Sequence, residues 1–315
     1  PADLRSRIWP LAIGNRIHVT PEMFRITLNR ARNLQEIEQN IREESRTAET
    51  EDGVHAPANT ASSGGRKKRS SNSKVQKSLA IIVTDLARTF PGLQLFGGGD
   101  QWSTDLREVL EAFACHRPDM GYVQGMSYVA GMLLLHIPDR YMVFQCLANL
   151  LVQGHLFAFY RGGIDKYCQL FSHVLEKQLP GIFRKFSDDQ IEPKMYFYPW
   201  IQTVFSQHLP LAIASRIWDN FLVGGEVGGT AFLFRAAIAI IMVLQSDLMA
   251  ASFEDRMMIL QRKSVGQEIW NEKVTSERLF QSIDKVRLSG STKERVAMLF
   301  GDVFEFHPGY VENLI

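Results

Sequence analysis

The sequence predicts an all-α fold, and three observations support this prediction. Leu106, Val109, Leu110 and Phe113 repeat at the i, i+3, i+4, i+7 spacing of a helix with one apolar face. Alternating strand patterns bounded by Asn-Gly or Asp-Gly turns, which signal β-hairpins, are absent. Hydrophobic residues make up 45% and charged residues 22% of the 315 residues, values typical of a globular chain with a sizeable core.

The expected helices follow one another along the chain. Thr20 is a predicted N-cap before Pro21, which suits the first position of a helix. Another helix is expected to end within residues 82–88, because Pro91 shortly afterwards prevents helical continuation. Apolar periodicity predicts further helices at 106–113, 141–152, 167–175, 201–209 and 233–244.

Residues 47–74 interrupt this pattern. Val54 is their only large apolar residue, and most of the others are Ser, Thr, Ala, Gly and charged side chains. Such a composition buries too little apolar surface to offset the entropy of ordering, so a disordered insertion is expected. Its basic run Arg66–Arg69 is typical of a nuclear-localisation or phosphate-binding patch, but a solvated charged loop is the simpler interpretation.

Composition and motif searches exclude several classes of protein. Lys and Arg number 35 against 34 Asp and Glu, a net charge of +1 that argues against a dedicated nucleic-acid binder. The three cysteines lack CxxC spacing, which favours a reducing compartment over a disulfide framework. The histidines lack metal-ligand spacing, and the adjacent Cys115 and His116 are expected to be a core cysteine beside a surface histidine. No metal site is therefore predicted.

Membrane insertion is not expected either. The uncharged stretch 120–138 contains Gln, Ser, His and three glycines and falls short of a membrane span. The first residues carry charges where a signal peptide would be apolar. The chain begins at Pro1 without a methionine, so we expect a soluble fragment of a longer polypeptide.

Two short segments are less generic. Asp85 and Arg88 are i, i+3 neighbours at a helix end, on the side opposite Ile82 and Leu86, and taken alone they predict a surface ion pair. Gln124 lies between two glycines in 121–125, which allow a tight turn before the next helix. Taken alone, Gln124 would be a turn residue.

Together, the two segments resemble the IxxDxxR and YxQ motifs of the TBC domain, the Rab GTPase-activating module. In this sequence the motifs read Ile82-Val-Thr-Asp85-Leu-Ala-Arg88 and Tyr122-Val-Gln124. The insertion at 47–74 separates the first motif of the family from the arginine motif, but it leaves both segments intact. Further segments resemble other motifs of the family in the expected order: Arg5–Trp9 with Gly14, Trp200–Phe205, Leu209–Pro210, Arg216–Asp219 and Phe232–Arg235.

The resemblance implies an all-α fold of two helical subdomains that form a V. The expected boundary lies near residue 185, which gives an N-terminal subdomain at 1–185 and a C-terminal subdomain at 186–315. Among the motif residues, Trp9, Trp200 and Trp218 are expected in the core. Arg216 and Asp219 are expected to pair at i, i+3 and tie helices together.

The resemblance also implies a function, namely activation of GTP hydrolysis on a Rab-type small GTPase in vesicle trafficking. Arg88 would be an arginine finger that neutralises developing charge, and Gln124 a glutamine finger that orients the attacking water. Asp85 would orient Arg88, and Tyr122 would support Gln124. Both fingers would belong to the N-terminal subdomain.

The implied partner is a Rab protein in its GTP-bound form. The chain would have no cofactor of its own and carry out no reaction on a nucleotide of its own, since GTP and Mg²⁺ arrive with the GTPase. A cytoplasmic protein is expected, recruited to membrane surfaces through partners, without binding to nucleic acid. The alternative is a non-catalytic Rab-binding scaffold with the same fold, but the presence of both Arg88 and Gln124 favours the active interpretation.

Overall fold

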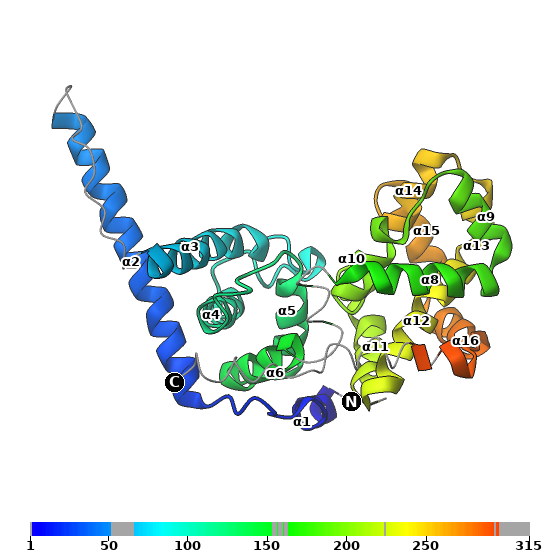
Figure 1. The fold of residues 1–315 in the computed structure, drawn as a ribbon, viewed down its shortest axis with the longest axis horizontal. Coiled ribbons are helices and arrows are strands. Elements are labelled where there is room, and N and C mark those ends of the chain that lie inside the picture. The colour runs from blue at the N-terminus through cyan, green and yellow to red at the C-terminus, as the bar shows by residue number, and fades with distance from the viewer. Residues whose placement is uncertain are drawn as a thin grey trace. The chain divides into compact units, whose positions relative to one another are not determined.

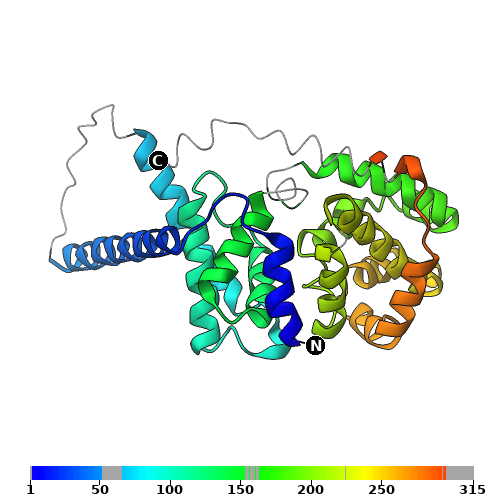
Figure 2. The same ribbon diagram turned by 90° about the horizontal axis from the view of Figure 1, so that it is seen from below.

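The computed structural model describes residues 2–51, 66–152, 156, 160, 163–223, 225–292 and 294–295. Regular secondary structure in this part of the chain is helical throughout and includes no strand (Figures 1 and 2), which confirms the all-α prediction. The helices up to residue 152 are α1 (Ala2–Ile13), α2 (Pro21–Glu51), α3 (Arg66–Leu86), η1 (Pro91–Leu93), α4 (Gln101–His116), α5 (Met126–His136) and α6 (Arg140–Val152). Those that follow are α8 (Ile164–Gln178), α9 (Pro180–Asp188), η2 (Pro193–Met195), α10 (Phe197–Gln202), α11 (Leu211–Val223), α12 (Gly225–Val243), α13 (Gln245–Ala250), α14 (Phe253–Gln261), α15 (Val265–Lys273) and α16 (Ser276–Lys285).

The chain divides into two compact units. We call Asn15–Ala148 the central unit, and the described residues of Pro1–Gly14 and Asn149–Ile315 the terminal unit. This division differs from the expected subdomains, whose boundary was placed near residue 185. The physical reason is packing: α8 packs against α9, α10 and α12, while α1 packs against α11. The V-shaped arrangement stays a prediction.

Helix α4 is the core of the central unit. Asp100 caps its N-terminus by accepting a hydrogen bond from the backbone N of Ser103 at 2.9 Å. Val109, Leu110 and Phe113 are fully buried, as their spacing predicts. Helices α2, α3 and α5 each pack against α4 and so surround it. The unit therefore has a single helical core on which its loops are supported.

A carboxylate joins α1 to α11 in the terminal unit. The Arg5 guanidinium donates to both oxygens of Asp219 at 2.8–3.2 Å, and the Trp9 indole N–H donates to Asp219 Oδ1 at 3.0 Å. The Trp9 and Trp218 rings stack 5.4 Å apart, and the buried Trp9, Trp200 and Trp218 confirm the expected core tryptophans. The expected ion pair between Arg216 and Asp219 is wrong.

Arg216 has other partners because Asp219 is engaged by Arg5 and Trp9. Its guanidinium lies 3.8 Å from the centroid of the Phe280 ring and donates to Ser276 Oγ. The i, i+3 spacing places two side chains near each other, but it does not decide which partner each one takes.

The helix expected at 201–209 is also wrong. Helix α10 ends at Gln202, and Val204 and Phe205 have positive φ angles of 48° and 61°. These conformations break the helix although the segment is apolar and deeply buried. An apolar run that is buried on all sides does not reveal its local conformation through periodicity. The other expected helices, at 106–113, 141–152, 167–175 and 233–244, correspond to α4, α6, α8 and α12.

The expected disordered insertion at 47–74 is contradicted at both ends. Helix α2 extends to Glu51, and α3 begins at Arg66, while residues 52–65 lie outside the described residues. Polar and charged residues such as Glu, Gln, Lys and Arg have good helix propensity, so a low apolar content does not by itself prevent a helix. Arg30 on α2 donates to Asn72 Oδ1 on α3 at 3.1 Å and connects the two helices.

Buried histidines are a second departure from the sequence-based expectations. His116, expected at the surface, is buried with its ring 5.6 Å from that of Phe144, and burial lowers its pKa to about 4. His208, which follows α10, is also buried, and burial lowers its pKa to about 3. Both imidazoles are therefore neutral in the folded protein near pH 7.

We expect the free energy of unfolding to fall as the pH falls from 7 to 5. An unfolded histidine titrates near pH 6.5, so between that pH and about 3 the unfolded chain binds a proton at His208 that the folded chain does not. The contribution of His208 to this loss is about 2 kcal/mol. Urea unfolding at both pH values should show a smaller pH dependence for His208→Gln than for the half-buried control His173→Gln. Equal pH dependence in the two variants would contradict the assignment.

Candidate functional site

The first segment of the site is the C-terminal end of α3. Ile82 and Leu86 are buried, as expected, and the chain leaves the helix through hydrogen bonds from Arg88 N to Asp85 O and from Thr89 N to Leu86 O, at 3.2 and 3.0 Å. Arg88 Nη2 donates to Asp85 Oδ1. The Arg88 side chain is 55% exposed, whereas that of Asp85 is only 2% exposed. The pair is therefore not an ordinary surface ion pair, because its carboxylate is buried.

The second segment is the loop between α4 and α5. Gly121 and Gly125 have φ angles of +68° and +99°, and Gly125 is the N-cap of α5, so the two glycines provide the turn that their spacing predicts. Gln124 is exposed just before the helix begins. A Cβ atom at Gly121 would lie 2.7 Å from Ser78 Oγ on α3, which shows how closely this loop approaches that helix.

Asp85 connects the two segments. The Tyr122 hydroxyl donates to Asp85 Oδ2 at 2.7 Å, and the Tyr122 backbone N donates to Ser78 Oγ at 2.9 Å. One buried carboxylate thus accepts hydrogen bonds from Arg88 on one segment and Tyr122 on the other. Burial, with the nearby Asp85 carboxylate, raises the pKa of Tyr122, so the phenol stays protonated and can donate.

Three further residues contribute to this cluster and were not singled out in the sequence. The Thr89 hydroxyl lies 2.7 Å from the Asp85 carbonyl oxygen, to which it donates, and 2.7 Å from Ser127 Oγ. The Tyr128 hydroxyl donates to the Arg88 carbonyl at 2.6 Å. The only sequence signal was the position of Ser127 and Tyr128 directly after the glycine turn, and this spacing does not reveal their partners across 38 and 40 residues.

The arrangement suits recognition of a charged, oxygen-rich group from a partner. A guanidinium has five N–H donors in a planar fork, and the ion pair with Asp85 uses Nη2. A glutamine amide offers both donors and an acceptor. Arg88 and Gln124 therefore bring complementary polar groups to the surface of the central unit, on loops held together by buried hydrogen bonds.

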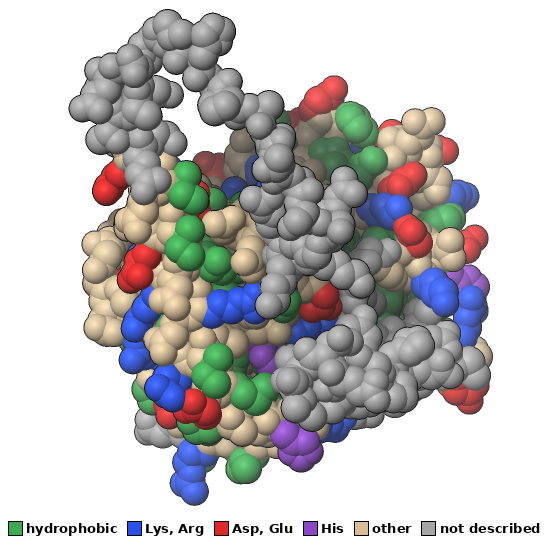
Figure 3. Space-filling view, turned by 60° about the vertical axis from the view of Figure 1, so that its left-hand side comes forward, with side chains coloured by type: hydrophobic (Ala, Val, Ile, Leu, Met, Phe, Trp, Pro, Cys, Tyr) green, Lys and Arg blue, Asp and Glu red, His purple; other side chains and the backbone are tan. Residues whose placement is uncertain are grey.

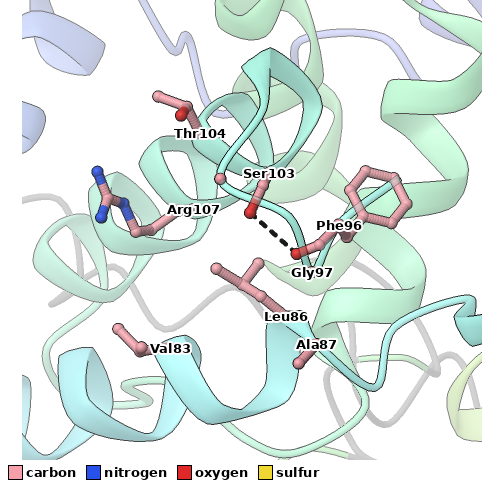
Figure 4. A pocket seen from close by; sticks show the side chains of 9 residues that line it. Val83, Leu86, Ala87, Phe96, Gly97, Ser103, Thr104 and Arg107 are labelled. Atoms are coloured by element: carbon pink, nitrogen blue, oxygen red, sulfur yellow. Dashed lines mark hydrogen bonds between the residues drawn. The ribbon is translucent and has the colours of Figure 1, made fainter. Parts of the chain in front are cut away.

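A shallow hollow lies beside the arginine segment, between the end of α3 and the start of α4 (Figure 4). Its volume is about 190 Å³, and Ala87 and Leu86 form part of its wall. The Ser103 hydroxyl donates to the Phe96 carbonyl at 2.9 Å, so this polar side chain is already engaged. The hollow is smaller than the roughly 300–1,000 Å³ of typical small-molecule pockets.

Other kinds of site find little support in the described part of the chain. Its His, Cys, Asp and Glu side chains form no group of three or more that could hold a metal ion. None of its helices is both long and apolar enough to cross a membrane. On the face in Figure 3, blue basic and red acidic side chains of the described residues are intermixed.

The chain is similar in sequence to several known proteins. A model of the Rab-GTPase-TBC domain family matches residues 2–249. TBC1 domain family member 12 from Xenopus tropicalis is 34% identical over 299 residues, which cover 93% of this chain and 39% of the relative. TBC1 domain family member 14 from Homo sapiens is 32% identical over 301 residues, which cover 95% of this chain and 39% of the relative. Drainin from Dictyostelium discoideum is 30% identical over 307 residues, which cover 91% of this chain and 67% of Drainin.

The fold is similar to that of a solved structure. The YPT/RAB-GAP domain of Gyp1p aligns with a TM-score of 0.57 at 16% identity, covering 98% of this chain and 89% of that domain. At this identity the likeness concerns the fold alone, and it confirms the expected TBC-like helical fold. This chain spans 39% of the length of the two TBC1 domain family relatives.

We expect Gly121→Ala to destabilise the central unit more than Gly99→Ala does. Both positions have a positive φ, +68° and +74°, which costs a non-glycine residue about 1–2 kcal/mol. A Cβ at Gly99 meets open space, whereas one at Gly121 would lie 2.7 Å from Ser78 Oγ. Urea unfolding should therefore show an extra loss for Gly121→Ala. Equal losses would mean that the loop does not dock closely on α3.

Proposed function

The chain belongs to the Rab-GTPase-TBC domain family, and on this premise we propose that it accelerates GTP hydrolysis on a Rab-type small GTPase. The observation that carries the proposal is the buried Asp85 carboxylate, which binds Arg88 and Tyr122 together. This contact holds the two motif segments beside each other while Arg88 and Gln124 remain exposed.

Arg88 would act as the arginine finger. In the transition state of phosphoryl transfer, negative charge spreads over the transferring group, and a guanidinium supplied by a partner stabilises it. Asp85 restrains the Arg88 side chain through Nη2, so less side-chain freedom is lost when the GTPase binds. The guanidinium donors on Nε and Nη1 would then face the γ-phosphate.

Gln124 would act as the glutamine finger. Its amide could accept a hydrogen bond from the attacking water and donate another, which orients the water in line with the bond that breaks. Tyr122, two residues earlier, would anchor this loop through Asp85 and Ser78. GTP and Mg²⁺ would arrive with the Rab protein, and this chain would contribute side chains only.

A panel of GTP-loaded Rab proteins tests the proposal directly. Phosphate release should be faster with this chain than without it for at least one Rab, under single-turnover conditions. If the chain binds a GTP-loaded Rab without accelerating phosphate release, the non-catalytic scaffold is correct and the proposal fails. If no Rab is either bound or activated, neither interpretation stands.

Arg88→Ala should lower the stimulated rate at saturating concentration by about 10³–10⁵-fold, which is roughly 4–7 kcal/mol of transition-state stabilisation. Arg88→Lys should lose most of the activity as well, because an ammonium does not reproduce the planar fork. Arg107 is a matched control, since it is 47% exposed and lies 3.8 Å from the buried carboxylate of Glu111 in the next turn. Arg107→Ala should retain the stimulated rate. A fully active Arg88→Lys would contradict the finger assignment.

Gln124→Ala should be almost inactive, whereas the control Gln101→Ala, at another exposed glutamine, should not be. Small GTPases normally orient the attacking water with a glutamine of their own. If Gln124 takes over this role, a Rab in which that glutamine is replaced by alanine should still be activated by this chain. Single-turnover hydrolysis at saturating concentration separates catalysis from weak binding. The two-finger mechanism fails if that Rab is resistant while Gln124→Ala remains active on the unmodified Rab.

A further inference from the structure

The backbone at Arg88 has a partner that neither motif includes. The N–H of Arg88 is bonded to the Asp85 carbonyl inside the same turn, and the carbonyl of Arg88 accepts from the Tyr128 hydroxyl at 2.6 Å. The side chain of Arg88 is restrained separately, by Asp85. The peptide unit that follows Arg88 is therefore held at both ends: its N–H, that of Thr89, donates to the Leu86 carbonyl at 3.0 Å, and its carbonyl accepts from a side chain 40 residues away.

Tyr128 is well placed to hold that peptide unit. It is the third residue of α5 and lies four residues after Gln124, and its backbone N donates to the Gly125 carbonyl at 3.1 Å. Its ring packs against Phe90, with centroids 5.2 Å apart. Burial raises the pKa of Tyr128, so its hydroxyl is protonated at neutral pH and available as a donor.

We propose that Tyr128 is a positioning residue that fixes the Arg88 backbone relative to α5, the helix that follows Gln124. The inference rests on the proposed function and adds a second connection to the one through Asp85. Asp85 and Tyr122 restrain the Arg88 side chain, whereas Tyr128 restrains the direction of the Arg88 carbonyl. Tyr128 would act through Arg88 and not by touching GTP.

A positioning role for Tyr128 predicts that Tyr128→Phe changes the rate of hydrolysis more than the stability of the fold. The bond between Tyr128 and Arg88 lies at the surface, so in Tyr128→Phe water can hydrate the Arg88 carbonyl and little folding free energy is lost. Water does not hold the carbonyl in one direction, and small errors in the placement of a catalytic group are costly to the rate. Loss of the hydroxyl should thus affect rate more than stability.

Tyr141 offers a matched control in the same unit. Its hydroxyl also lies within hydrogen-bond distance of a backbone carbonyl, that of Val19, at 3.0 Å, and is 3.0 Å from Gln145 Oε1 as well. Tyr128→Phe and Tyr141→Phe therefore each remove a tyrosine hydroxyl that contacts a backbone carbonyl, but only the first acts on Arg88. A general loss of stability would affect both variants.

The kinetic experiment uses whichever Rab the unmodified chain activates. We expect Tyr128→Phe to lower kcat by about 3- to 10-fold, equivalent to about 0.6–1.4 kcal/mol, with KM for the GTP-loaded Rab changed less than about twofold. Tyr141→Phe should leave kcat unchanged. In an Arg88→Ala background, Tyr128→Phe should have no further effect. Replacing Tyr128 with p-aminophenylalanine, which retains an N–H donor, should restore much of kcat.

Hydrogen exchange provides a readout that needs no GTPase. The backbone amides of Arg88 and Thr89 should exchange faster in Tyr128→Phe than in Tyr141→Phe, because the turn they close loses its anchor. If no Rab is activated, the proposed function fails, and exchange still decides whether Tyr128 holds this turn. If a Rab is activated but Tyr128→Phe matches the unmodified chain in kcat or in exchange, the positioning role is overturned. A further loss in the Arg88→Ala background would overturn it as well.

Discussion

A buried carboxylate that must be satisfied is the constraint on which the candidate site depends. Removing a charged group from water is costly unless donors replace its hydration. Asp85 meets this requirement with Arg88 from its own segment and Tyr122 from the loop before α5. Because Tyr122 is fixed, Gln124 two residues later is carried to a defined position. The hydrogen bonds that satisfy the buried Asp85 carboxylate thus position the segments that carry the exposed Arg88 and Gln124.

The surrounding contacts show why the exposed side chains can be functional without loosening the fold. Ser78, Thr89 and Ser127 are buried and hydrogen-bonded, so the polar cluster around Asp85 is part of the core of the central unit. Fully satisfied polar clusters of this kind are rigid, because leaving any member unpaired is costly. The side chains of Arg88 and Gln124 are exposed beside this cluster, where a partner can reach them.

The terminal unit also uses a carboxylate to connect segments that lie far apart in the chain. Asp219 accepts from Arg5 and Trp9, which precede it by 214 and 210 residues, and so joins α1 to a helix far along the chain. In the same unit a buried cation, Arg256, connects separate elements by donating to the Asp189 carboxylate and to the carbonyl of Leu248. In each case a charged group collects partners from separate elements. Unlike Arg5 and Trp9, which bind Asp219, the Arg88 side chain that binds Asp85 is more than half exposed to solvent.

The sequence by itself determined the helical class, most of the helices and the identity of the candidate side chains. Apolar spacing specifies which face of a helix is buried, and the resemblance of two short motifs to those of the TBC family singled out Arg88 and Gln124. The tertiary structure alone decided that Asp85 is buried, that Tyr122 donates to it, and that Tyr128 holds the Arg88 carbonyl. It also decided the end of α10 at Gln202. Apolar periodicity predicts that a helix face will be buried, but it does not predict which residues pack against that face. Those residues come from distant parts of the chain, and their contacts form only when the whole core packs.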